Sequence, residues 1–88
     1  MTHIVIDGAA IRDREALHGL LAERLALPAW YGRNLDALHD CLTDLREVTM
    51  VLRNAGAMTA ALGDYGDRVL RVFRDSAAEN PGFGFVEI

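Results

Sequence analysis

Residues 25–45 read LALPAWYGRNLDALHDCLTDL, and this stretch is predicted to contain the end of one helix, an aromatic turn and a second, complete helix. Pro28 ends the first helix, because proline has no amide hydrogen and its ring clashes with the preceding helical turn. Leucines at helical spacing predict the second helix over about residues 33–44. Its apolar stripe comprises Leu35, Leu38, Leu42 and Leu45, with Cys41 beside them as a small core residue.

The opposite face of this predicted helix carries Asp36, Asp40 and Asp44 at intervals of four residues. Like charges at this spacing destabilise a helix by roughly 0.2–0.5 kcal/mol per pair. No arginine lies between Arg33 and Arg46 to neutralise them. A sequence selected for folding alone would interrupt the stripe with a basic residue. The stripe is therefore consistent with a binding surface for a cationic partner, or with an ordinary solvated helix face.

The turn before this helix contains two adjacent aromatic residues, Trp30 and Tyr31. Two neighbouring aromatic side chains in a polar turn are not expected to be buried together. One is predicted to pack beneath the helix while the other is exposed and available as a contact anchor. The alternative is that both cover the edge of the core.

Three short runs outside this stretch predict β-strands, because each is rich in β-branched or aromatic residues and is bounded by turn formers. They are His3–Asp7, Val48–Arg53 and Phe83–Ile88. The remaining predicted helices begin after the cap Asp13, span about Met58–Leu62 and run from about Tyr65 to Glu79. Strands that alternate with helices lie parallel and are joined by right-handed crossovers. We therefore predict an α/β fold in one domain over residues 1–88, with a three-stranded, mainly parallel sheet packed against about four helices.

The composition of the 88 residues restricts the functions that the chain can have. Its net charge of −4 disfavours nucleic-acid binding, which needs a basic surface, and favours a cationic macromolecular partner. Its single cysteine excludes an intrachain disulfide and a cysteine-rich zinc site. With no secretory signal and no apolar run of membrane-spanning length, we expect a cytoplasmic location without membrane attachment.

An enzymatic function would need a cluster of catalytic or metal-binding side chains. Asp36, His39 and Asp40 could approach one another on a single helix, but three ligands from one turn without a second cluster make a weak metal site. His3 and His18 are interpreted as a strand-edge and a helix-surface residue, without a partner for a catalytic triad. We therefore expect no enzyme activity, no metal and no other cofactor.

The predicted last helix also carries two carboxylates four residues apart, Asp75 and Glu79. Here arginines share the acidic face, since Arg71 can pair with either Asp67 or Asp75. The pattern alone therefore favours a salt-bridged solvent face on this helix, in contrast to the unneutralised stripe on the earlier one.

Residues 25–45 resemble the central segment of the barstar family, whose members inhibit bacterial ribonucleases. The shared pattern is long and ungapped, namely L-P-x-aromatic-Tyr-Gly-x-Asn-Leu-Asp-Ala-Leu-x-Asp-Cys-Leu-Thr. Similarity continues in Ile11-Arg12, in Leu17-His18 and in Val69–Asp75. The resemblance thus covers essentially the whole chain and weakens only around residues 49–66.

The resemblance implies that the segment around the acidic helix enters the active site of a barnase-like ribonuclease. By position, Asp40 corresponds to the central carboxylate, which takes the place of a substrate phosphate, and Asp36 corresponds to its companion. Two residues depart from the family pattern, because His39 stands in place of tryptophan and Asp44 in place of glycine. The implied partner-binding residues are Trp30, Asn34, Asp36, His39, Asp40, Asp44, Asp75 and Glu79.

The resulting hypothesis is an inhibitor of the antitoxin or immunity type, whose partner is a cationic, secreted ribonuclease. We expect the protein to be monomeric when free. The alternative is an acidic interaction module, or an immunity protein for a different cationic toxin, because an acidic face does not identify its partner.

Overall fold

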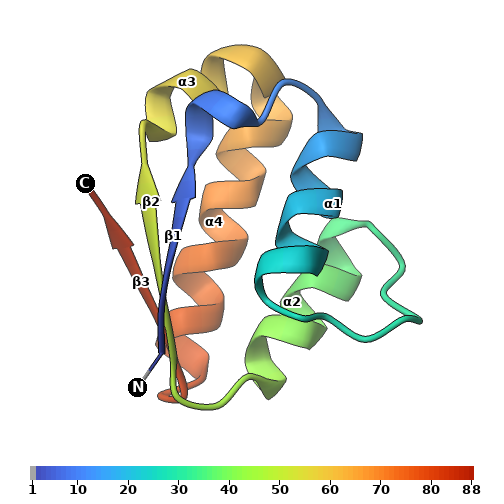
Figure 1. Cartoon of the computed structure of the whole chain (residues 1–88), viewed down its shortest axis with the longest axis vertical. Coiled ribbons are helices and arrows are strands. Elements are labelled where there is room, and N and C mark those ends of the chain that lie inside the picture. Colours follow the sequence, from blue (N-terminus) through green and yellow to red (C-terminus); the bar gives the residue numbers. More distant parts are fainter. Residues whose placement is uncertain (1) are drawn as a thin grey trace.

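A computed structural model of the chain describes residues 2–88, in which a sheet forms one layer and helices cover one side of it (Figure 1). The strands are β1 (Thr2–Asp7), β2 (Val48–Arg53) and β3 (Phe83–Glu87). They are parallel and lie in the order β1-β2-β3, with Val51 between Val5 and Val86. The predicted α/β fold with a three-stranded parallel sheet is therefore confirmed.

Within residues 2–88, four α-helices and one short 3-10 helix connect the strands. They are η1 (Gly8–Ala10), α1 (Arg14–Arg24), α2 (Leu35–Asp44), α3 (Ala55–Leu62) and α4 (Asp64–Glu79). The helix α3 begins three residues before the predicted Met58, because the run Ala55-Gly56-Ala57 continues the helix without an apolar period. No helix of the described part of the chain is long and apolar enough to cross a membrane.

Side-chain caps fix where α1 and α2 begin. The carboxylate of Asp13 accepts a hydrogen bond of 2.7 Å from the backbone N–H of Ala16, as predicted for the start of α1. The side-chain oxygen of Asn34 accepts a hydrogen bond of 2.8 Å from the N–H of Ala37 in the same way. Caps of this kind stabilise a helix by about 1 kcal/mol. Asn34 therefore sets the first turn of α2, and with it the start of the aspartate stripe.

One hydrophobic core lies between the sheet and the helices. Its fully buried side chains include Ile6, Leu17, Leu21, Leu38, Leu42, Met50, Leu52, Met58, Val69, Phe73 and Phe83. The buried leucines of α2 belong to the predicted stripe, so the opposite side of that helix must face solvent. Cys41 lies beside them in the core, and burial raises the pKa of its thiol.

Candidate functional site

The acidic face of α2, formed by Asp36, Asp40 and Asp44, points away from the core. All three residues are exposed, and the side chain of Asp40 keeps 78% of its accessible surface. None of the three carboxylates forms an ion pair with an arginine of the described chain. The unneutralised stripe predicted from the sequence is therefore present at the surface.

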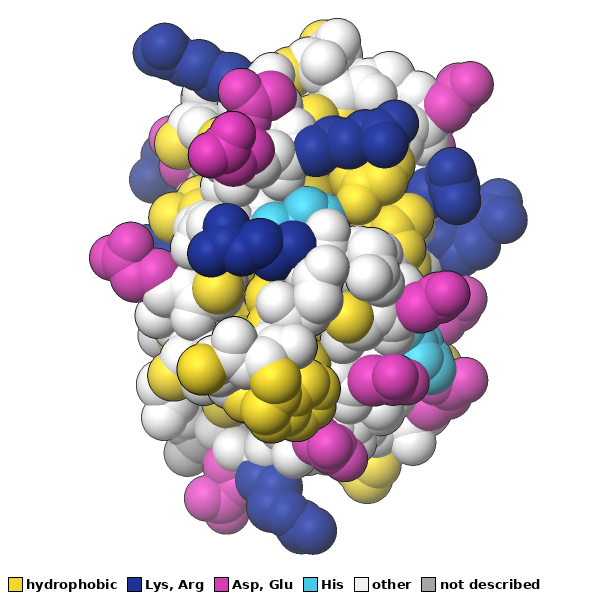
Figure 2. Space-filling view, turned by 90° about the vertical axis from the view of Figure 1, so that its right-hand side faces the viewer, with side chains coloured by type: hydrophobic (Ala, Val, Ile, Leu, Met, Phe, Trp, Pro, Cys, Tyr) yellow, Lys and Arg dark blue, Asp and Glu magenta, His cyan; other side chains and the backbone are white. Residues whose placement is uncertain are grey.

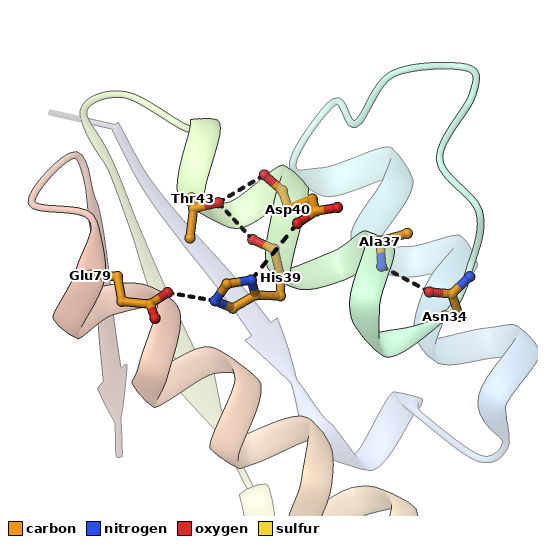
Figure 3. Close-up of polar contacts among 6 residues, drawn as sticks. All are labelled: Asn34, Ala37, His39, Asp40, Thr43 and Glu79. Carbon is orange, nitrogen blue, oxygen red and sulfur yellow. Dashed lines mark hydrogen bonds and ion pairs between the residues drawn. The ribbon is translucent and has the colours of Figure 1, made fainter.

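His39 links the acidic face to the end of α4 (Figure 3). Its Nε2 atom lies 2.5 Å from a carboxylate oxygen of Glu79, and its Nδ1 atom lies 3.9 Å from a carboxylate oxygen of Asp40. The contact with Glu79 joins residues that are 40 positions apart in the sequence. Glu79 therefore belongs to the same surface as the acidic face.

Hydrogen bonds within α2 hold the turn that carries Asp40. The hydroxyl of Thr43 donates to the backbone carbonyls of His39 and Asp40, each at 3.0 Å (Figure 3). The Asn34 cap at one end and the buried leucines below complete the support of the helix. A rigid carrier of this kind loses little conformational entropy when it binds a partner.

The predicted neutralisation of α4 by its own arginines is wrong. Asp75 is exposed one helical turn before Glu79. Across residues 2–88, none of Asp67, Arg71 and Asp75 takes part in an ion pair. Exposed pairs on a helix gain little over hydration, which explains why these side chains remain in solvent. Asp75 therefore adds unneutralised negative charge to α4, on which Glu79 also lies.

The aromatic turn separates into one exposed and one buried residue, as predicted. Trp30 is 71% exposed, whereas Tyr31 is only 7% exposed. Two residues in left-handed conformations frame the turn, Ala26 with a φ of 51° and Arg33 with a φ of 52°. Non-glycine residues in this region cost about 1–3 kcal/mol each, so the surrounding contacts must hold the turn in one shape. Trp30 is thus presented to solvent from a fixed position.

The interpretation of His18 as a helix-surface residue is wrong, because its side chain is only 3% exposed. Its Nδ1 atom lies 2.5 Å from the hydroxyl of Tyr31, and its Nε2 atom lies 2.7 Å from the hydroxyl of Tyr65. Burial first, and then the positive charges of Arg33 and Arg14, lower the pKa of His18. A neutral imidazole, which offers one donor and one acceptor, therefore joins α1 to the aromatic turn and to α4.

In Figure 2, carboxylates gather beside one histidine and arginines around another. This agrees with the contacts of His39 with Asp40 and Glu79, and with the hollow that His18 lines together with three arginines. His3, in contrast, is exposed on the edge strand β1, as predicted. Within residues 2–88, no three His, Cys, Asp or Glu side chains are grouped so that they could hold a metal ion. The face offers fixed negative charge and an exposed tryptophan, and these are features with which a surface binds a macromolecule.

Comparison with known proteins shows that this chain is similar to ribonuclease inhibitors. The sequence model of the family described as Barstar (barnase inhibitor) matches residues 1–86. A protein of Bacillus subtilis (strain 168) named "Putative ribonuclease inhibitor YrdF" is 43% identical over 81 residues, which cover 90% of this chain and 89% of that protein. The family match includes the aromatic turn, α2 and α4, from which Trp30 and the acidic residues of this surface come.

Proposed function

Since the chain belongs to the barstar family, we propose that it inhibits a barnase-like ribonuclease and is not itself an enzyme. In this proposal the acidic face of α2 enters the active site of the nuclease. The observation that carries the proposal is the outward row of Asp36, Asp40 and Asp44, which has no arginine partner in the described chain. The similarity to a protein named as a ribonuclease inhibitor supports it.

The chemistry of ribonucleases explains why such a face inhibits. A ribonuclease needs fixed positive charge to hold the substrate phosphate and to stabilise the transition state. A carboxylate that is held rigidly among those cationic groups competes with RNA for them, and contacts between arginine and carboxylate are strong because they can be bidentate. Asp40, at the centre of the acidic face, takes this role, and Asp36 assists it one turn earlier.

The residues around the acidic face would complete the contact. Trp30 is large, exposed and held in a fixed turn, so it can serve as an apolar anchor. Asn34 lies beside the first turn of α2, and Asp44 lies at its last residue. Glu79 and Asp75 extend the negative surface onto α4, and His39 positions Glu79. The field of these charges would also speed the encounter with a cationic enzyme.

An acidic interaction module, or an immunity protein for a different cationic toxin, is the second candidate. The same row of carboxylates favours it, because unneutralised negative charge selects a basic concave partner without specifying its reaction. In either case we expect the chain to act as a monomer in the cytoplasm. If the partner is a ribonuclease, the chain would protect the RNA of the cell that makes it.

The test begins with capture of the secreted nucleases of the producing organism by the immobilised chain. The captured enzyme is assayed for RNA cleavage with and without the chain, and the affinity is measured by titration calorimetry. Asp40→Ala is expected to weaken binding by about 2–5 kcal/mol, the usual loss when one partner of a buried charge pair is removed. Asp36→Ala is expected to cause the next largest loss.

Glu87→Gln is the matched control, because Glu87 lies on β3 and its carboxylate is already paired with Arg74 at 2.6 Å. This variant is expected to bind as tightly as the wild type. Wild-type affinity in Asp40→Ala would contradict the proposed insertion of α2. Capture of a cationic toxin without RNA-cleaving activity would favour the second candidate.

A further inference from the structure

Beside the acidic face lies a hollow of about 370 Å³, which we term the basic hollow because three arginines line it. Arg14 is the first residue of α1, Arg33 precedes α2, and Arg68 lies on α4. The hollow is also lined by His18 and Tyr65, so the buried imidazole described above lies at its wall. Three separate segments of the chain therefore bring guanidinium groups to one place.

The three guanidinium groups have no carboxylate partner of their own. Within residues 2–88, neither Arg14, Arg33 nor Arg68 forms an ion pair or a hydrogen bond with another side chain. Arg14 instead packs over the ring of Tyr65, with its guanidinium carbon 4.0 Å from the ring centre. The positive ends of α1 and α2 lie at the same hollow and add to its positive potential.

The basic hollow and the acidic face are continuous. Asn34, Leu35 and Asp36 line the hollow, and Asp36 is also the first carboxylate of the acidic face. Arg33 immediately precedes Asn34 and lines the same hollow, so a partner that covers Asn34 and Asp36 comes next to its guanidinium group. To bury a guanidinium group without a counter-ion is costly, because its hydration is lost and nothing replaces it. Asp36 lines the hollow, but no carboxylate of residues 2–88 forms an ion pair with these three arginines, so a covering partner would have to supply the contact.

We propose that the basic hollow receives a carboxylate-bearing segment of the ribonuclease that the chain inhibits. This inference rests on the proposed function and adds a second, opposite charge to its docking face. The cognate enzyme then carries acidic side chains next to its basic active site. A nuclease that has the basic site but lacks the neighbouring carboxylates is rejected, since it would leave Arg14, Arg33 and Arg68 covered and unpaired.

The affinities of Arg33→Ala and Arg68→Ala for the captured ribonuclease test this inference. Each variant is expected to bind about tenfold or more weakly, and Arg33→Glu more weakly still, because it adds repulsion to the loss of the contact. Arg53→Ala is the matched control, since Arg53 is exposed at the end of β2 and does not line the hollow. All three residues changed, Arg33, Arg53 and Arg68, are exposed, so circular dichroism should confirm unchanged folding.

Chemical modification of arginines gives a second readout on the unaltered complex. Phenylglyoxal is expected to react with Arg33 and Arg68 in the free chain and to leave both unmodified in the complex. Arg53 is expected to react equally in both states, as mass spectrometry of the peptides would show. Equal reaction of Arg33 and Arg68 in the free and bound chain would overturn the inference.

The Asp40→Ala variant separates a failure of this inference from a failure of the proposed function. If Asp40→Ala loses affinity while Arg33→Ala and Arg68→Ala keep it, the docked carboxylate is refuted and the inhibitor remains. If the chain binds no ribonuclease, both are refuted. A third outcome is saturable binding of a short RNA oligonucleotide that depends on Arg33 and Arg68, while the affinity of both variants for the nuclease is unchanged. This outcome would refute the docked carboxylate and would assign the hollow to nucleic acid.

Discussion

Two histidines near the proposed binding face, His18 on α1 and His39 on α2, have opposite surroundings. His18 is 3% exposed and lies between two tyrosine hydroxyls, with Arg14 and Arg33 beside it. The side chain of His39 is 37% exposed and contacts carboxylates on α2 and α4. His18 therefore joins separate segments of the fold, whereas His39 lies among carboxylates at the surface.

This difference shows how the two ends of the face are built. The basic end depends on tertiary packing, because α1, the aromatic turn and α4 must all be in place before the arginines converge. The acidic end depends on a single helix, whose periodicity alone turns its aspartates outward. Substitution of the buried His18, which joins these segments, should therefore change the stability of the fold, whereas substitutions of the exposed aspartates should change binding and leave the fold intact.

The largest expected effect comes from His18→Leu. The substitution leaves the buried hydroxyl of Tyr31 and the partly buried hydroxyl of Tyr65 without their partner. We expect the free energy of unfolding to fall by roughly 2–4 kcal/mol, since each orphaned buried polar group costs about 1–3 kcal/mol. Urea denaturation followed by circular dichroism measures this change.

His39→Gln is the matched control for this prediction, because His39 has its partners at the surface. Its free energy of unfolding should stay within about 1 kcal/mol of the wild type, as is usual for exposed charge pairs. Equal destabilisation by His18→Leu and His39→Gln would contradict the prediction that only the buried histidine stabilises the fold.

The buried His18 should also make the stability of the fold depend on pH. The pKa of His18 in the folded chain lies below its ordinary value of 6.5, so the unfolded chain binds this proton more readily. Stability conferred by the neutral imidazole is therefore fully present above pH 6.5 and is lost as the pH falls through the lowered pKa. His18→Gln should remove this part of the pH dependence, as shown by the difference between the wild-type and variant stability curves. Identical slopes in the two curves would contradict it.

Most of the fold could be predicted because its signals are local. The strand β2 begins and ends at the predicted residues, and β1 and β3 differ by one residue at one end. The caps Asp13 and Asn34 act within their own helix turns, so a short window of sequence contains both partners. The start of α3 was missed because its first turn carries small residues without an apolar period.

In the candidate site, too, the features that depend on local sequence could be predicted and the features that depend on distant segments could not. The acidic face and the exposed Trp30 follow from residues that are neighbours in the sequence. The contacts of His39 with Glu79 and of His18 with Tyr65 join residues 40 and 47 positions apart. A local sequence pattern does not predict contacts between residues so far apart. The basic hollow needs three segments at once, so only the folded chain reveals it.

The smallest expected effect on stability comes from a substitution on the acidic face of α2. Asp44 is exposed at the last residue of α2, where a negative charge opposes the helix dipole. Asp44→Ala should therefore leave the fold as stable as before, or stabilise it by about 0.3–1 kcal/mol.

The same variant should associate more slowly with the nuclease at low salt, because long-range attraction to the cationic enzyme is reduced. The difference in rate should shrink as salt is added and screens the charges, which stopped-flow measurements across a salt series would follow. An association rate that is independent of salt in both proteins would contradict the proposed long-range attraction by the acidic face.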